Sequence, residues 1–168
     1  MQKIEALKIL GFASGTKATH ADLKSAYRTL CRTYHPDINP AGEIIMKQIN
    51  AAWEALKGLG DSLASEDLGN YAIDPDLLAK LSKALQAIVV LEGLEIEICG
   101  SWIWLAGNTM EHREAIKAAG YRWAATKKKW YFRTQEDAQP SRKAMSMDYI
   151  RKRYGSQSYG DSEKRYLA

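Results

Sequence analysis

The chain has 168 residues, of which 46% are hydrophobic and 26% are charged, and its formal net charge is +4. These values are typical of a soluble protein with one domain or two small ones. No apolar run is long enough to span a membrane, and residues 1–10 lack the order of a signal peptide, so we expect a cytoplasmic protein without a membrane partner. Cys31 and Cys99 are predicted to be free, packed thiols, and the histidines and cysteines lack metal-ligand spacing, so we expect no metal and no cofactor.

Charge is distributed unevenly along the chain. Residues 1–58 carry 8 basic and 5 acidic side chains, residues 59–93 carry 2 and 6, residues 94–133 carry 7 and 4, and the rest carry 7 and 5. The corresponding net charges are +3, −4, +3 and +2. This asymmetry predicts two basic modules on either side of an acidic connector.

Three helices are predicted in the first third of the chain. A short helix near residues 4–10 ends at Gly11, a second begins at Thr19 or His20, and a third covers about residues 41–57. The second and third helices each have apolar residues at helical spacing, which are Leu23, Tyr27, Leu30 and Tyr34, then Ile45, Ile49, Ala52, Trp53 and Leu56. Because two amphipathic helices joined by a short loop pack antiparallel, we expect a helical hairpin.

The loop of this hairpin contains the stretch TYHPDINP, residues 33–40. Pro36 ends the second helix, since the residue before a proline disfavours the α region. A basic row, which we define as Lys24, Arg28 and Arg32, lies beside the apolar stripe of the second helix. The polar side chains of the loop are expected to face solvent next to this row.

Several segments over residues 3–57 resemble the J-domain of DnaJ-type co-chaperones. The segments EALKILGF, ADLKSAYRTLCRTYHPDINP and MKQINAAWEAL contain, in order, a Leu-Gly helix end, a Tyr-Arg-x-Leu core, His-Pro-Asp, and Ile-Asn-x-Ala-Trp-x-x-Leu. J-domains bind a DnaK-type chaperone ATPase and stimulate its ATP hydrolysis. The resemblance therefore implies a co-chaperone with no enzymatic activity of its own.

The resemblance also implies which residues bind the chaperone: His35, Pro36, Asp37, Asn39, Lys24, Arg28 and Arg32. Pro36 fixes a backbone dihedral and so lowers the entropy of presenting its neighbours, and Asp37 is an acceptor for a partner arginine. The basic row would speed docking onto an acidic surface. Thr29 and Ile38 stand where family members often carry basic residues, which implies weaker binding or a particular partner.

Simpler interpretations remain open at this point. The basic row is equally explained as a solvated helix face, and Pro36 as a mere helix stop. A catalytic dyad of His35 and Asp37 is a poor alternative, because no nucleophile stands beside them.

Residues 59–74 are predicted to form an acidic, Gly/Ser-rich linker, so residues 1–58 and 75–154 would be separate modules. Asp74-Pro75 predicts the start of a helix that Gly93 ends. The remaining patterns predict a ββαββ unit: a hairpin turning at Gly100-Ser101, a helix from Asn108 to Ala119 with a capping box to Glu111, and a hairpin turning near Thr126-Lys127. The fold class is therefore α+β, a helical hairpin followed by a small antiparallel sheet with flanking helices.

The register of the two hairpins predicts which residues share a sheet face. Ile98 should face Ile103 and Ile96 should face Leu105, and in the second hairpin Trp123 should pair with Trp130. The opposite face of the first hairpin collects Cys99, Glu97, Trp102 and Trp104.

Aromatic and basic residues are interleaved in this sheet. The candidates for binding single-stranded nucleic acid or a protein partner are Trp102, Trp104, Arg122, Lys127, Lys128, Lys129, Tyr131 and Arg133. Bases stack on aromatic rings while cations follow the backbone, which favours nucleic acid. Exposed tryptophans equally favour a protein-binding platform, and core packing explains them without any ligand.

The end of the chain predicts a helix over residues 141–154 and a disordered tail over residues 155–168. The segment AGYRWAATKKKWYF resembles a small module of phage and mobile-element proteins, which implies a short phage- or prophage-type protein. Our interpretation is a co-chaperone that directs a DnaK-type ATPase to a target held by the C-terminal module. The rivals are a nucleic-acid-binding protein that uses the hairpin as a docking arm, and a phage factor that diverts the host chaperone.

Overall fold

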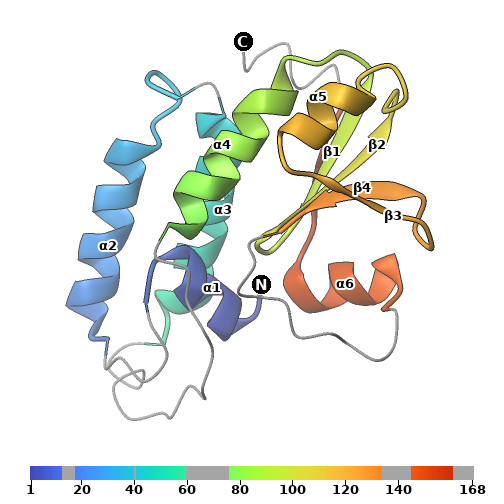
Figure 1. Ribbon diagram of the computed structural model, residues 1–168. Coiled ribbons are helices and arrows are strands. Elements are labelled where there is room, and N and C mark those ends of the chain that lie inside the picture. The colour runs from blue at the N-terminus through green and yellow to red at the C-terminus, as the bar shows by residue number, and fades with distance from the viewer. Residues whose placement is uncertain (13–17, 40, 60–75, 134–144, 161–168) are drawn as a thin grey trace.

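Figure 1 shows the protein as a computed structural model, which describes residues 1–12, 18–39, 41–59, 76–133 and 145–160. All strands of the described residues lie in the second half of the chain. In chain order they are α1 (Lys3–Ile9), α2 (His20–Thr33), α3 (Gly42–Leu56), α4 (Leu77–Val89), β1 (Leu94–Cys99), β2 (Trp102–Gly107), α5 (Arg113–Ala118), β3 (Arg122–Ala124), β4 (Lys129–Phe132), α6 (Met147–Tyr154) and β5 (Gln157–Tyr159).

The helical hairpin predicted for the first third is confirmed. Thr19 begins α2 with a capping box, in which its hydroxyl accepts from the Asp22 backbone N–H and its own N–H donates to the Asp22 carboxylate. Tyr27 of α2 stacks on Trp53 of α3 and donates a hydrogen bond to Asn50. Tyr27 lies in the middle of α2, whereas Asn50 and Trp53 lie in the second half of α3. The end of α2 is next to the start of α3, so the two helices run antiparallel.

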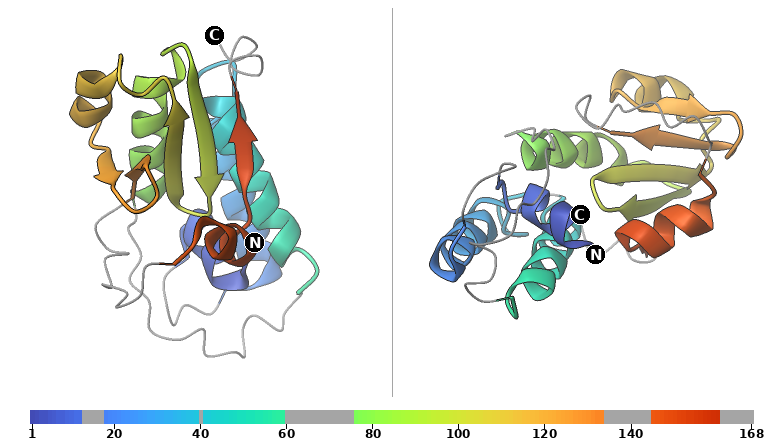
Figure 2. Two further views of the ribbon diagram at one scale, coloured as in Figure 1. Left: turned by 90° about the vertical axis from the view of Figure 1, so that its right-hand side faces the viewer. Right: turned by 90° about the horizontal axis from the view of Figure 1, so that it is seen from below.

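The sheet is antiparallel, with strand order β3-β4-β2-β1-β5. Both predicted hairpins and their register are confirmed, since Ile98 pairs with Ile103, Ile96 with Leu105, and Trp123 with Trp130. The fifth strand, β5, was not expected (Figure 2, left).

The prediction of a disordered tail is therefore wrong for residues 157–159. The ring of Tyr159 is buried, and its backbone pairs with β1 opposite Ile96, so burial and strand pairing stabilise this polar stretch. Residues 161–168 lie outside the described residues, as do most of the predicted linker and residues 141–144 of the last predicted helix.

Three helix starts differ from prediction. The helix α4 begins at Leu77 with Asp76 as N-cap, and the predicted cap and first residue at 74–75 lie outside the described residues. The helix α5 begins at Arg113, because Asn108 bonds the side chain of Glu111 instead of capping a helix. The helix α6 begins at Met147, where Ser146 accepts a bond from the Tyr149 N–H.

One hydrophobic core joins the two halves of the molecule. The helix α4 packs against α1 and α3 on one side and against α5 on the other, and the core runs without interruption from Leu7 to Ile103. Polar contacts cross the same boundary: the Ser101 N–H donates to the buried Glu5 carboxylate at 2.7 Å, and Gln48 donates to Gln157. The helix α6 covers the opposite face of the sheet (Figure 2, right).

Candidate functional site

The loop after α2 is held by its own backbone. The N–H groups of Ile38 and Asn39 both donate to the His35 carbonyl at 3.1 Å, and the Gly42 N–H donates to the Asn39 carbonyl at 2.7 Å. The chain therefore turns sharply at Pro36, and these three backbone hydrogen bonds hold the turn together and connect it to the start of α3. In physical terms, the segment is a preorganised turn at the tip of the hairpin.

Three consecutive side chains of this turn face solvent: His35, Pro36 and Asp37. The Asp37 N–H donates to Nδ1 of His35 at 3.3 Å, and the Asp37 carboxylate lies 3.4 Å from the same nitrogen. Accepting at Nδ1 assigns the proton of the neutral ring to Nε2. The backbone N–H of Asp37 thus orients the imidazole, and both side chains lie at the surface, where an approaching partner can reach them.

The basic row on α2 is exposed along its whole length. Within the described part of the chain, Lys24, Arg28 and Arg32 have no ion-pair partner. Unpaired cations at helical spacing produce a positive surface potential that attracts an acidic partner. The row and the turn lie on one element and its direct continuation, so a single partner surface can contact both.

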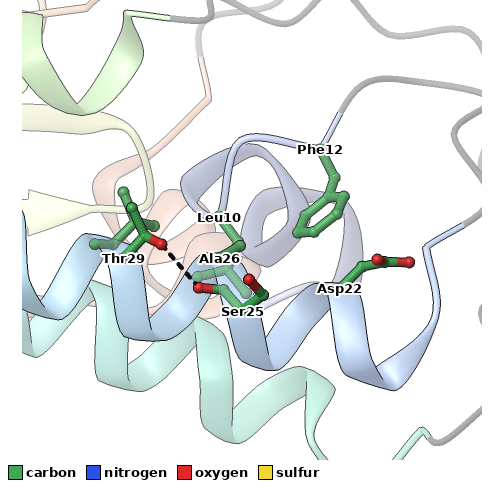
Figure 3. Close-up of a pocket in the computed structure, with 7 residues that line it drawn as sticks. Leu10, Phe12, Asp22, Ser25, Ala26 and Thr29 are labelled. Carbon is green, nitrogen blue, oxygen red and sulfur yellow. Dashed lines mark hydrogen bonds between the residues drawn. The ribbon is translucent and has the colours of Figure 1, made fainter.

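A shallow groove lies between α2 and the residues that follow α1 (Figure 3). Its volume is about 470 Å³, and the residues that line it are Leu10, Phe12, Asp22, Ser25, Ala26, Thr29 and Leu30. Thr29 forms part of its wall and donates its hydroxyl to the Ser25 carbonyl at 3.1 Å. The position where a basic residue is often found in the family therefore belongs here to the rim of a weakly polar groove.

Asn39 does not face solvent as the other polar residues of the loop do. Its side chain is 9% exposed, donates to Ser82 Oγ at 2.9 Å, and accepts from the Ala41 N–H and from Gln86. The expectation that it points outward to a partner is corrected, because the docking of α4 against the loop turns this amide inward. Sequence patterns gave no signal for this contact, which joins residues more than 40 positions apart.

Gly42 is a second residue that sequence reasoning missed. It is buried at the first position of α3, and a Cβ there would lie 2.7 Å from the Pro36 Cα and 2.9 Å from the Tyr34 carbonyl oxygen. Only a residue without a side chain lets the backbone of α3 approach the turn so closely. The backbone of Gly42 thus packs against the inner side of the turn, and the side chain of Asn39 bonds the turn to α4.

The aromatic face of the sheet is largely covered, as expected from core packing, the alternative that needs no ligand. Trp104 is 2% exposed and Ile150 of α6 is 5% exposed, and both belong to a small second core. Trp102 is half-buried and stacks on Trp104 with ring centroids 5.8 Å apart. Among the described residues, the indole N–H of Trp104 has no hydrogen-bond partner. Trp104 is therefore a packing residue under α6, and the stacking of a nucleic-acid base on its ring is excluded in this fold.

Cations in this region already have intramolecular partners. Lys127 lies 5.6 Å from the Trp104 ring centroid, Arg133 lies 5.1 Å from that of Trp102, and Lys129 forms an ion pair with Glu97 at 3.1 Å. These contacts neutralise or cover three of the predicted binding cations. Tyr131 is half-buried against both tryptophans, with centroids 5.9 Å from Trp102 and 5.5 Å from Trp104.

Glu97 is the buried acceptor at the centre of this face. Its carboxylate accepts from Arg151 at 2.5 and 3.0 Å, from Ser156 at 2.8 Å and from Lys129 at 3.1 Å. The bonds from Arg151 are the main reason that the pKa of Glu97 falls to about 2, with Ser156 and Lys129 adding to the effect against the cost of burial. Burial and the neighbouring Glu97 charge raise the pKa of the Cys99 thiol to about 11, so Cys99 is an unreactive packed thiol at neutral pH.

The exposed part of the aromatic and basic set is at the β3–β4 hairpin. Arg122 and Lys128 are exposed there, and Trp123 is 49% exposed beside the buried Trp130. Trp123 was predicted in the sheet but not as a surface residue. It is the large aromatic side chain of this hairpin that a partner can reach.

Comparison with known protein families matches residues 6–59 to the DnaJ domain. The N-terminal third of this chain is a DnaJ domain. The chain is also 40% identical over 72 residues to the chaperone protein DnaJ of Acetivibrio thermocellus, a match that covers 41% of this chain and 18% of that protein. The matched segment thus spans less than a fifth of the length of that relative. No solved structure matches this chain.

The family match ends at residue 59, whereas the hydrophobic core of α1 to α3 also includes side chains of α4 and of the sheet, so the match and the core have different boundaries. Among the described residues, no helix is long and apolar enough to cross a membrane. The same residues contain no group of three or more His, Cys, Asp or Glu side chains that could hold a metal ion.

Proposed function

We propose that this chain is a co-chaperone whose DnaJ domain docks on a DnaK-type chaperone ATPase and stimulates its ATP hydrolysis. The observation that carries the proposal is the preorganised turn that exposes His35, Pro36 and Asp37 directly beyond the basic row, whose cations have no ion-pair partner among the described residues. A rigid turn loses little entropy on binding, and the row supplies long-range attraction to an acidic surface. The chain acts on its partner's ATPase and is not itself the enzyme.

The relative's name supports the same proposal. The relative that is 40% identical over 72 residues is named a chaperone protein, and the separate match to the DnaJ domain covers residues 6–59, which include the exposed turn. The basic row then has a role beyond solvation, since it lies on the same helix that leads into the turn.

Single-turnover hydrolysis of ATP bound to a bacterial DnaK-type chaperone tests the proposal. Arg28→Glu should lower the stimulation several-fold, because it reverses a charge in the middle of the basic row. Arg113→Glu is the matched control: Arg113 is exposed on α5, far from α2 in Figure 1, and the substitution changes the charge by the same amount. Equal effects of the two variants would refute docking through the basic row.

The C-terminal part is proposed to hold the target toward which the chaperone is directed. The exposed side chains Arg122, Trp123 and Lys128 support a contact surface on the β3–β4 hairpin, since an aromatic ring flanked by cations is a frequent anchor of protein and nucleic-acid contacts. A double variant, Arg122→Glu with Lys128→Glu, should abolish a salt-sensitive shift of single-stranded DNA if the target is nucleic acid. A wild-type chain that shifts no nucleic acid would leave a protein target. The origin in a phage or mobile element, and diversion of a host chaperone, stay predictions.

A further inference from the structure

The His-Pro-Asp turn is tied to a helix that lies outside the DnaJ domain. We propose that Ser82 and Gln86 of α4 are positioning residues for this turn, so that activation of the partner ATPase depends on α4 as well as on the DnaJ domain. This inference rests on the proposed function and names a further requirement of the same site.

Asn39 is the link between the two elements. Its Nδ2 donates to Ser82 Oγ at 2.9 Å, and its Oδ1 accepts from Gln86 Nε2 at 3.0 Å and from the Ala41 N–H at 2.9 Å. Gln86 Nε2 also lies 3.3 Å from Ser82 Oγ, which closes a triangle of three side chains. Ser82 is 4% exposed and Asn39 is 9% exposed, so the hydrogen bond between them is shielded from water, whereas Gln86 is exposed and its two bonds are partly buried.

The backbone of Asn39 transmits this tether to the exposed residues. Its N–H donates to the His35 carbonyl, and its own carbonyl accepts from Gly42 at the start of α3. Fixing the Asn39 side chain therefore fixes both ends of the turn. Among the described residues, the His35 side chain has polar contacts only with Asp37. Without this tether, the bonds from the Ile38 and Asn39 N–H groups to the His35 carbonyl would open more often, because the Asn39 side chain would no longer be held against α4.

The position of α4 is in turn set by the sheet. Tyr121, which precedes β3, is buried and donates its hydroxyl to the Ala84 carbonyl of α4 at 3.1 Å. Ala84 lies between Ser82 and Gln86 in the sequence. The sheet thus positions α4 through Tyr121, and α4 positions the turn through Ser82 and Gln86. Residues 76–133 therefore have a role in the chaperone contact itself.

Amide hydrogen exchange on the full chain separates positioning from general stability. In Ser82→Ala and in Gln86→Glu, the Ile38 and Asn39 amides should exchange roughly 5- to 30-fold faster, as expected when one or two buried hydrogen bonds are lost. The Tyr34 amide, bonded to the Leu30 carbonyl inside the hairpin, should keep its rate. Lys83→Gln is the control for Gln86→Glu, since it changes an exposed α4 residue by the same charge.

The second readout is single-turnover ATP hydrolysis by a DnaK-type chaperone at a subsaturating concentration of each variant. Both positioning variants should stimulate hydrolysis at least fivefold less than Lys83→Gln does, while their unfolding midpoints in urea stay above the assay conditions. Loop exchange at the wild-type rate in both variants overturns the positioning role, whatever the hydrolysis assay gives. Wild-type protein that stimulates no hydrolysis would refute the proposed function instead, and the exchange rates would then decide the positioning role alone.

Discussion

The buried carboxylate of Glu97 should make the stability of the C-terminal part depend on pH. The bonds from Arg151, Ser156 and Lys129 lower its pKa from 4.5 to about 2. At about 1.4 kcal/mol per pKa unit, this fall corresponds to about 3 kcal/mol of stabilisation of the charged form in the folded state. Because the folded pKa is the lower one, the contribution is complete above about pH 5 and is lost as the pH falls toward 2.

Glu97→Gln isolates this contribution, since glutamine keeps the shape of the side chain and removes only its charge. The variant should be less stable than the wild type by about 2 to 3 kcal/mol at pH 7, because Arg151 and Lys129 lose their counter-ion. The lower part of that range is expected, because the Arg151 side chain is 41% exposed and can regain water. The difference should shrink as the pH falls below 5 and approach zero only below about pH 2, where the carboxyl of the folded wild type is protonated as well.

Urea unfolding of both proteins at pH 7, 5, 4 and 3 measures this difference directly. Asp148→Asn is the control, because Asp148 is 93% exposed, pairs with the same Arg151 at 3.1 Å, and should change the stability by less than about 0.5 kcal/mol. Equal stability of Glu97→Gln and wild type at pH 7, or curves that run parallel down to pH 3, would refute the reasoning.

Three further predictions concern the turn, the tryptophans and the basic row. Gly42→Ala should cost about 1 to 3 kcal/mol in urea unfolding, because its Cβ would lie 2.7 Å from the Pro36 Cα, and it should reduce stimulated hydrolysis more than a surface substitution of α3 such as Lys47→Ala. Trp123→Phe should remove most of the acrylamide-quenchable tryptophan emission, while Trp104→Phe should leave it nearly unchanged, since the two indoles are 49% and 2% exposed. Stimulation of hydrolysis by the wild type should weaken as salt rises from about 50 to 300 mM, and Arg28→Glu should flatten that dependence; a salt-independent rate would contradict steering by the basic row.

Local patterns predicted the helical hairpin and both β-hairpins because each is specified by residues close in sequence. The apolar spacing of Leu23, Tyr27 and Leu30 identifies the buried side of α2, and the alternation around Gly100-Ser101 sets the register of β1 and β2. The exposed turn was predictable for the same reason, since Pro36 and its neighbours act through local geometry.

The long-range contacts could not be predicted from these patterns. Asn39 faces α4 and Trp104 lies under α6 because elements distant in sequence pack against them, and periodicity does not say which element covers a given face. The strand β5 was missed because Gln157–Tyr159 is polar and short, and only Tyr159 carries a signal for burial. Glu97 gave a weak signal, a carboxylate within an otherwise apolar strand, but its partners on α6 and beyond were not evident.

Single-turnover hydrolysis with His35→Gln is the most direct test of the proposed function. His35 is exposed and oriented by Asp37, so replacing it removes the imidazole without disturbing the core. The account predicts that the wild-type chain accelerates hydrolysis of ATP bound to a bacterial DnaK-type chaperone and that His35→Gln, folded to the same extent by circular dichroism, does not. Equal acceleration by the two proteins would contradict a working role for the exposed turn.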